Sequence, residues 1–408
     1  MSLNINTKEK DKNNQFLSFW VCILSTLILF TYLQNYYSVL IHMVVFCCCF
    51  FSLKSIEIKT LKFIFFSILP ALVLSLMAIN REFTTPIGQL GFFLHYITWP
   101  VILSLVVKSN TTKHIFIILR IIIILCIIGN LASIIVLLED NTVSRILAGS
   151  SETEKLKYYA MGVGGYGYVF AMSFLTFGAV SWLKKADKRL DKALLITFLI
   201  TNYIFIIYAS YTTAIILTFV LTVLSLINNK NSVITGLILI FVMLLLIIIG
   251  PWLLELGLSL AESLELDWVE LRFTQLIEAT TEGDFSSLKR FRLYMMSIEE
   301  FCKNPLIGGN GVGGHSEILD ALGGFGIFGM SVPIIIIIYS KFCMQFSKKT
   351  SMLLFYIIFF IFAAIDTVST MQIPIVVFFV VPLISNVISR NEIIDKKIQD
   401  PIITKKFS

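Results

Sequence analysis

Long apolar stretches separated by short polar segments dominate the chain. A helix needs about 20 mostly apolar residues to cross the roughly 30 Å hydrocarbon core of a bilayer. On that scale the pattern predicts twelve membrane-spanning helices, of which the seventh and eighth are separated only by the polar residues 210–213. The predicted spans are residues 16–33, 36–53, 62–79, 88–107, 115–138, 160–183, 193–209, 212–227, 233–253, 321–340, 352–370 and 373–389.

The composition agrees with this pattern. Of the 408 residues, 57% are hydrophobic and 14% are charged, whereas a soluble domain carries about 25% charged residues. This excludes a soluble enzyme, a nucleic-acid-binding protein and a disordered chain. The alternating ten-residue strands of an outer-membrane barrel are also lacking. We therefore predict an all-α polytopic membrane protein, with residues 1–408 forming one integral membrane domain.

The distribution of basic residues predicts the orientation. If the N-terminus is cytoplasmic and every predicted span crosses, 23 of the 32 Lys and Arg fall on the cytoplasmic side and nine fall outside. Cytoplasmic loops of membrane proteins are enriched in Lys and Arg. Both termini are therefore predicted to be cytoplasmic. The two outside loops that carry the most polar residues are then 139–159 and 254–320.

The longer outside loop is predicted to contain helices of its own, since structureless connections of that length are uncommon. Residues 253–282 have an amphipathic pattern, and a second helix is expected from about Ser287 to Lys303, where Asn304-Pro305 ends it. Five glycines then occur among residues 308–314, followed by His315 and Ser316. Such a run allows backbone N–H groups to converge on an anion, although turns are the commoner role of glycine.

Ser316 has the position of an N-cap for the tenth span, which would place His315 just before a helix N-terminus. A helix N-terminus favours phosphate or developing negative charge. The four histidines have no partner at helical spacing, which predicts no metal site. Two charged residues, Arg120 and Asp366, fall in the interior of predicted spans. Arg120 is expected to extend its side chain toward the cytoplasm. Asp366 has three alternatives: a functional role, a hydrogen bond to Thr367, or an ion pair with an Arg of an outside loop.

One segment resembles a known family. His315-Ser316, nine residues, Gly326, two residues and Gly329 are similar to the His-(Asn/Ser/Gln)-x9-Gly-x-x-Gly pattern of the O-antigen polymerase and O-antigen ligase superfamily. Arg290, about fifteen residues before an Asn-Pro-x-x-Gly turn, resembles that family's loop Arg, and Arg145 resembles its other loop Arg more loosely. The specific pattern covers residues 289–330, and the topology resembles the family over the whole chain.

Two further segments bear on the resemblance. Residues 162–168, which open the predicted sixth span, look like the opening of some capsule-type polymerases. Many relatives carry a Ser-Arg pair between the seventh and eighth spans. This chain has Ser210-Tyr211-Thr212-Thr213 there, so no role of that Arg is carried over.

The resemblance implies a glycosyltransferase in the bacterial cytoplasmic membrane, with its active site facing outside. Its substrate would be an oligosaccharide on undecaprenyl pyrophosphate, it would need no metal or other cofactor, and a chain-length regulator would be a partner. A pyrophosphate leaving group suits Arg, which stays charged and binds anions bidentately. We expect Arg145 and Arg290 to bind the pyrophosphate, with Arg292 as a third cation.

The remaining expected site residues surround these cations. His315 would contact phosphate or act as the base on the acceptor hydroxyl, with Asp320 and Glu152 as alternative bases. Other expected substrate contacts are Tyr294, Gly311, Gly313, Gly314 and Ser316. The predicted activity is polymerisation of O-antigen or capsule repeats. The alternatives are a ligase that transfers the finished glycan, and a transporter of lipid-linked oligosaccharide.

Overall fold

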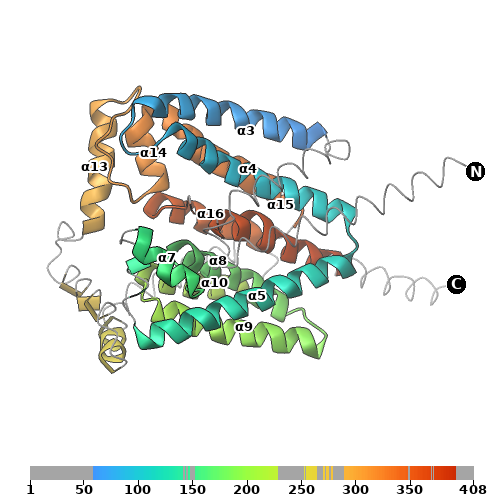
Figure 1. Cartoon of the computed structure of the whole chain (residues 1–408). Coiled ribbons are helices and arrows are strands. Elements are labelled where there is room, and N and C mark those ends of the chain that lie inside the picture. Colours follow the sequence, from blue (N-terminus) through green and yellow to red (C-terminus); the bar gives the residue numbers. More distant parts are fainter. Residues whose placement is uncertain are drawn as a thin grey trace, which may run out of the picture.

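The structure is a computed structural model of helices packed into one bundle (Figure 1). It describes residues 58–140, 143, 146–147, 152–227, 252, 254–263, 270–271, 273–274, 277–278, 289–347, 350–368, 370 and 372–391. Within these residues the secondary structure is helical, with no β-strand. The elements on the first half of this range are α3 (Ile58–Met77), a 3₁₀ turn (Ala78–Asn80), α4 (Pro86–Ser109), α5 (Thr112–Glu139), α7 (Glu152–Ala160), α8 (Tyr166–Leu183), α9 (Arg189–Tyr208) and α10 (Thr212–Leu226).

The second half carries the elements that follow the long polar loop. These are α13 (Lys289–Lys303), α14 (Glu317–Phe325), a 3₁₀ segment (Gly326–Met330), α15 (Ser331–Met344), α16 (Thr350–Ile365), α17 (Gln372–Ile375) and a π-helical segment (Val376–Val380). Helical structure continues from the π segment to residue 391.

Seven described helices are long and apolar enough to cross a membrane, so the protein is a polytopic helical membrane protein. They match seven of the predicted spans. Two more predicted spans correspond to the shorter apolar helices Thr212–Leu226 and Ser351–Ile365. The predictions at 16–33, 36–53 and 233–253 lie outside the described residues, and the total of twelve stays a prediction. The seven are Lys62–Asn80, Pro86–Lys108, Thr112–Glu139, Tyr166–Leu183, Arg189–Tyr208, Glu317–Met344 and Gln372–Asn391.

The predicted sixth span, 160–183, began too early. Helix α8 begins at Tyr166, and the preceding residues form the separate helix α7 followed by a turn. Gly162 has a φ of +82°, a conformation that interrupts a right-handed helix. Gly164 and Gly165 lie so close to the rings of Tyr168 and Tyr159 that a Cβ on either glycine would clash. The glycine-rich segment is therefore a tight connection and not the first turn of the span.

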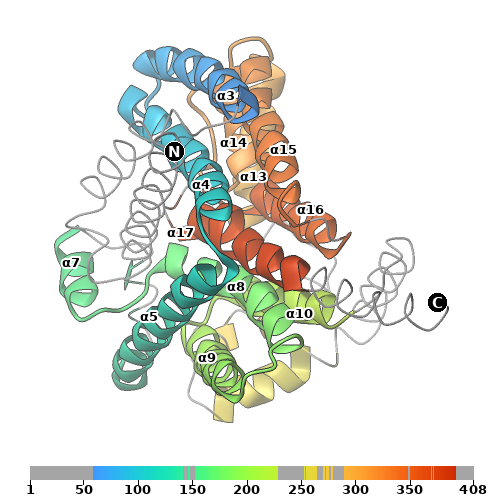
Figure 2. The same ribbon diagram turned by 90° about the vertical axis from the view of Figure 1, so that its right-hand side faces the viewer.

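The helix at Gln372–Asn391 forms the centre of the bundle. In its most apolar window 94% of the residues are buried, against 28% for Lys62–Asn80 at the periphery. It contacts α8 on one side and α4 on the other. Figure 2 shows it between a group made of α3, α4, α14, α15 and α16 and a group made of α5, α8, α9 and α10.

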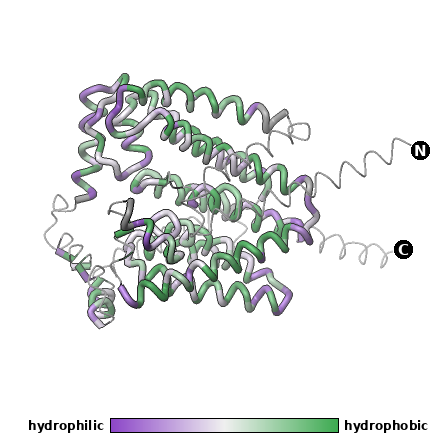
Figure 3. The backbone as a smooth tube through the Cα atoms, viewed as in Figure 1, coloured by the Kyte–Doolittle hydropathy of each residue, from purple (hydrophilic) through white to green (hydrophobic). Residues whose placement is uncertain are grey.

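Helix α13 differs from the rest. It stands nearly upright across the ends of α14 and α16 in Figure 1, while α3, α4, α5 and α9 run across the picture. Figure 3 shows that its residues are far more polar than those of the spanning helices. We call the side of the bundle that carries α13 the α13 end. The side that carries Lys184, Lys185 and Lys188 is the basic end.

Candidate functional site

The α13 end is organised around the last turn of α16 and the residues that follow it. The carbonyl of Ala364 accepts a hydrogen bond from Ser316 Oγ at 2.7 Å, and the carbonyl of Ile365 accepts one from the hydroxyl of Tyr294. The backbone N–H of Glu317 donates to the carbonyl of Asp366 at 3.3 Å. Residues 364–366 thus join α13 and α14 to the membrane-spanning bundle.

Asp366 forms an ion pair with Arg290, the first of the sequence-predicted site residues. Arg290 Nη1 lies 3.0 Å from Asp366 Oδ2 and 3.2 Å from Thr213 Oγ1. Tyr166 also donates a hydrogen bond to the Asp366 carboxylate, and the N–H of Thr367 donates to its Oδ1 at 3.0 Å. Arg290 therefore bonds residues at the ends of α10 and α16, and Asp366 connects it to Tyr166 at the start of α8. This confirms the expected pairing of Asp366 with a loop Arg.

The two partners of this ion pair differ in accessibility. The Asp366 side chain is 2% exposed and the Arg290 side chain is 39% exposed. The hydrogen bonds to Thr213 and Asp366 both use Nη1, and more than a third of the side chain is exposed, so a second anion can still approach the guanidinium. Burial by itself lowers the pKa of Arg290, but Asp366, with help from Tyr294 and Tyr166, raises it above its ordinary value. Arg290 is a permanent cation at a partly open position.

Tyr294 supports this arrangement. It lies one turn after Arg290 on α13, and its hydroxyl donates to the carbonyl of Ile365. Burial raises the pKa of Tyr294, while the Arg290 charge opposes that rise. The phenol therefore stays neutral at physiological pH and keeps its proton for the carbonyl. This contact fixes α13 against the end of α16 and gives Tyr294 a positioning role, while its expected substrate contact stays a prediction.

Ser316 is the N-cap of α14, as predicted. Its Oγ accepts from the N–H of Leu319 at 3.0 Å, and the residue is 1% exposed. Its own N–H donates to Asp320 Oδ2 at 2.9 Å. Since the Ser316 hydroxyl also donates to Ala364, its hydrogen bonds are directed to the protein and not to a ligand. Ser316 therefore has a structural role, and its expected contact with substrate stays a prediction.

The glycine run differs from the predicted anion nest. The N–H groups of Gly308, Gly309 and Gly313 donate to Asn304 O, Gly323 O and Ser297 Oγ, at 2.8, 2.9 and 2.9 Å. A Cβ on Gly313 would lie 2.1 Å from Leu293 O. These glycines allow the loop to pack closely against α13 and α14, so at these positions packing replaces the predicted binding of phosphate.

A carboxylate already occupies the space beside two glycines of this loop. A Cβ on Gly309 would lie 1.5 Å from Glu300 Oε1, and a Cβ on Gly311 would lie 2.6 Å from Glu300 Oε2. A phosphate placed there would meet a like charge, which argues against the expected contact at Gly311. Gly314 differs, because its φ is +73° and a Cβ there would have no heavy atom within 4 Å. The backbone beside His315 is therefore accessible at Gly314.

His315 is half-buried and lies between Gly314 and the cap of α14. Because Ser316 and Glu317 bond Ala364 and Asp366, His315 borders the same short segment that holds Arg290. The acidic first turn of α14, with Glu317 and Asp320, offsets the positive helix end. The structure therefore leaves the side chains of Arg290 and His315, and not the helix dipole, as the groups suited to an anion.

The other expected residues fall into three groups. Arg292 is exposed on α13, and residues two apart on a helix do not share a face, so it points away from Arg290. Asp320, an alternative base, accepts hydrogen bonds from Ser297 Oγ and the N–H of Ser316, which assigns it to holding the loop. Arg145 lies outside the described residues, and so does the side chain of Glu152.

Sequence reasoning did not assign Tyr166 or Thr213 to the site. Both carried a signal: Tyr166 follows the glycine-rich opening of α8, and Thr213 belongs to the polar patch between α9 and α10. Ser210 in that patch has a φ of +60°, which is unusual for a residue other than glycine. The patch therefore makes a sharp turn that brings Thr213 to Arg290, at the place where relatives of the resembled family carry a Ser-Arg pair.

The groups at this end that combine a positive charge or an imidazole with at least partial exposure include Arg290, Arg292 and His315, next to the open backbone at Gly314. They suit an anionic, hydrogen-bonding ligand. No group of three or more metal-ligating side chains occurs among the described residues. In comparisons with known proteins, no model of a protein family and no curated sequence matches the chain.

Proposed function

We propose that this protein is a membrane glycosyltransferase that polymerises undecaprenyl-pyrophosphate-linked repeat units of O-antigen or capsular polysaccharide. The reaction takes place at the outer face of the bacterial cytoplasmic membrane, which is the α13 end. The observation that carries the proposal is Arg290, a cation with a 39% exposed side chain, held by Thr213 at the start of α10 and by Asp366 at the end of α16. The resemblance around His315 supplies the substrate class.

The chemistry requires a cation that acts as the glycosidic bond breaks. The bond between the anomeric carbon and the pyrophosphate oxygen breaks, and its electron pair leaves with the pyrophosphate. An acceptor hydroxyl forms the new bond and loses its proton to His315 or to solvent. Arg290 stabilises the charge that grows on the leaving group, and a preorganised cation favours the transition state over the ground state.

The position of the charged residues favours an enzyme over a transporter. Secondary transporters place substrate-binding polar groups near the middle of the membrane. Among the described residues, the buried acidic side chains are Asp191 and Asp366, and each lies near an end of the bundle. The basic residues Lys184, Lys185 and Lys188 gather at the other end, which supports a cytoplasmic basic end.

The test is the size distribution of surface polysaccharide in a deletion strain complemented with the wild type, His315→Ala or Lys303→Ala. Lys303 is an exposed residue in the last turn of α13 and serves as the control for removing a polar side chain at the α13 end. We expect the wild type and Lys303→Ala to restore the long chains, whereas His315→Ala leaves single repeats. Immunoblots of the membrane fraction verify equal protein levels.

The alternatives give different profiles. Full-length polymer that accumulates on the lipid carrier and never reaches its acceptor would identify a ligase. Repeat units trapped on the inner side would identify a transporter. A profile that deletion does not change would refute the proposed pathway.

A further inference from the structure

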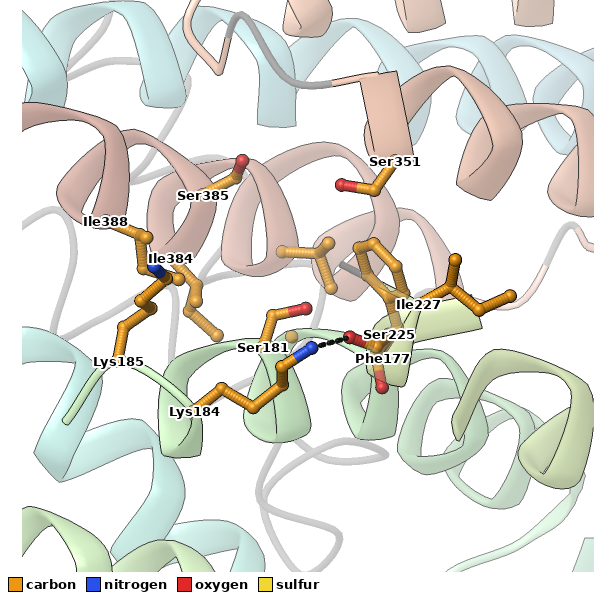
Figure 4. A pocket seen from close by; sticks show the side chains of 12 residues that line it. Phe177, Ser181, Lys184, Lys185, Ser225, Ile227, Ser351, Ile384, Ser385 and Ile388 are labelled. Carbon is orange, nitrogen blue, oxygen red and sulfur yellow. Dashed lines mark hydrogen bonds between the residues drawn. The ribbon is translucent and has the colours of Figure 1, made fainter. Parts of the chain in front are cut away.

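A small polar cavity lies at the basic end, far from Arg290 along the spanning helices (Figure 4). Its volume is about 70 Å³, enough for a few water-sized groups or a small tetrahedral anion, since one water occupies about 30 Å³ of liquid. Two lysines and four serines are among its twelve lining residues, and no Asp or Glu is. The polar members are Ser181, Lys184, Lys185, Ser225, Ser351 and Ser385.

The lysines are held there by the ends of the helices. Lys184 follows the last residue of α8, and its Nζ donates to the carbonyls of Ser225 and Leu226 at 3.1 and 2.8 Å. These are the final carbonyls of α10, where a cation is stabilised by the helix dipole. Figure 4 shows Ser351 and Ser385 on the helices across the cavity from Lys184. Cationic and hydroxyl donors thus surround one space from three sides.

A second, larger cavity adjoins the first and shares Lys184, Lys185 and Ile388 with it. Its volume is about 290 Å³. Its lining includes the rings of Phe116 and Trp182, whose centroids are 5.8 Å apart, together with charged residues of both signs. Asp187 and Asp191 lie beside Arg120 and Lys188 there, so the lining free of carboxylates is confined to the small cavity.

We propose that the small cavity binds the phosphoryl headgroup of an anionic membrane lipid. Lysine ammonium and serine hydroxyl groups donate hydrogen bonds to phosphate oxygens, and the absence of lining carboxylates in the small cavity avoids repulsion. The cavities lie at the ends of α5, α8 and α9, where lipid headgroups meet spanning helices. The apolar wall of Phe116, Trp182 and Ile388 contacts the glycerol and the first acyl carbons. This site is independent of the proposed glycosyl transfer.

The experiment uses the full chain in nanodiscs of phosphatidylcholine mixed with phosphatidylglycerol, followed by extraction and mass spectrometry of the lipid that stays bound. The cavity variant is Lys184→Gln/Lys185→Gln. The matched control, Arg189→Gln/Lys192→Gln, removes two positive charges from the same region without changing a lining residue of either cavity. We expect the wild type to retain phosphatidylglycerol selectively. In the cavity variant the retention of phosphatidylglycerol should fall by about 25-fold, since each of the two lysines is worth roughly a fivefold change in binding near an anionic surface. The control should keep most of the preference.

A second variant keeps both lysines, because Lys184 also supports the end of α10. Ser181→Ala/Ser351→Ala removes two hydroxyl donors and should lower the retention of phosphatidylglycerol by about fivefold. Equal losses in the cavity variant and the control, or no loss in the serine variant, would overturn the site in favour of diffuse surface charge. Inorganic phosphate that binds the wild type without displacing phosphatidylglycerol would overturn the lipid as the ligand. Phosphate that displaces it would support a headgroup site.

Discussion

Two Arg–Asp ion pairs, one near each end of the bundle, show how the same residues serve different purposes. Arg120 of α5 and Asp191 of α9 form a two-point pair at the basic end, with Nε–Oδ1 at 2.6 Å and Nη2–Oδ2 at 3.0 Å. Arg290 and Asp366 at the α13 end form a one-point pair through Nη1 at 3.0 Å. The exposed fractions of the Arg side chains are 25% and 39%.

The number of partners explains the difference. Asp191 satisfies Arg120 in the parallel geometry that the guanidinium fork prefers, and the pair joins two neighbouring membrane helices. Asp366 divides its oxygens among Arg290, Tyr166 and Thr367, so it holds the guanidinium without covering it. The first pair is suited to stability, and the second is suited to presenting a charge to a ligand. The predictions below test this contrast.

The largest effect on stability is expected at the Arg120–Asp191 pair, in which the carboxylate binds the guanidinium at two points. Arg120→Ala leaves the nearly buried Asp191 carboxylate without its partner, which costs on the order of 3–5 kcal/mol when a buried pair is broken. Thermal unfolding of the detergent-purified protein should show a clear drop in transition temperature. Arg120→Ala/Asp191→Ala should recover part of that loss, because no unpaired charge remains. A single variant as stable as the wild type would refute the structural role.

The next largest effect is expected at the Arg290–Asp366 pair, where the change should appear in activity. Arg290→Ala should lower polymerisation by about 10²–10³-fold, the usual consequence of losing one transition-state donor. Arg290→Lys should retain part of the activity, because it keeps the charge and loses the planar fork. The readout is polymer formed per amount of membrane-localised protein, with Lys303→Ala as the control. Full activity of Arg290→Ala would exclude Arg290 from the chemistry.

A smaller effect is expected at the carboxylate that holds Arg290. Asp366→Asn keeps the volume and the contact with Tyr166 but removes the charge that orients the guanidinium. We expect about a tenfold loss of activity, since positioning alone contributes strongly to rate. In an Arg290→Ala background the same substitution should cost nothing more. Additive losses would show that Asp366 acts by itself and does not position Arg290.

The smallest effect is expected at Tyr294, where Tyr294→Phe removes one hydrogen bond to Ile365 O and should cost about 1 kcal/mol. The pKa of Tyr294 in the folded protein is raised from its ordinary value of 10.0. The neutral phenol is the donor, so its contribution is fully present below pH 10 and falls as the pH rises further. The stability difference between wild type and variant should therefore stay constant from pH 6 to pH 9, which thermal unfolding at several pH values can check.

The sequence predicted helix ends well where a single residue type decides them. Ser316 caps α14 and Lys303 ends α13 before Asn304-Pro305, because an N-cap hydroxyl and a proline act on the adjacent backbone. It was less accurate at residues 160–165, where close approach to Tyr159 and Tyr168 requires the glycines. The ring positions depend on packing, which composition does not reveal.

The glycines of residues 308–329 likewise have roles that depend on packing. Gly326 and Gly329 of the resembled motif have structural reasons: Gly326 has a φ of +60°, and a Cβ on Gly329 would lie 2.0 Å from Ala321 O. The glycines at 308–313 serve packing in the same way, although the local pattern also allowed an anion nest. Only the positions of Glu300 and Ser297, from a neighbouring helix, distinguish the two uses.

The sequence by itself determined that this is a helical membrane protein with its distinctive polar residues in one long loop, because hydrophobic length and charge are local properties of the chain. It also singled out Arg290, His315 and Asp366 as residues of interest. Only the tertiary structure joined Arg290 to Asp366, Thr213 and Tyr166, which are 76, 77 and 124 residues away along the chain. Contacts between helices depend on how their faces pack, and no local pattern specifies which ends meet.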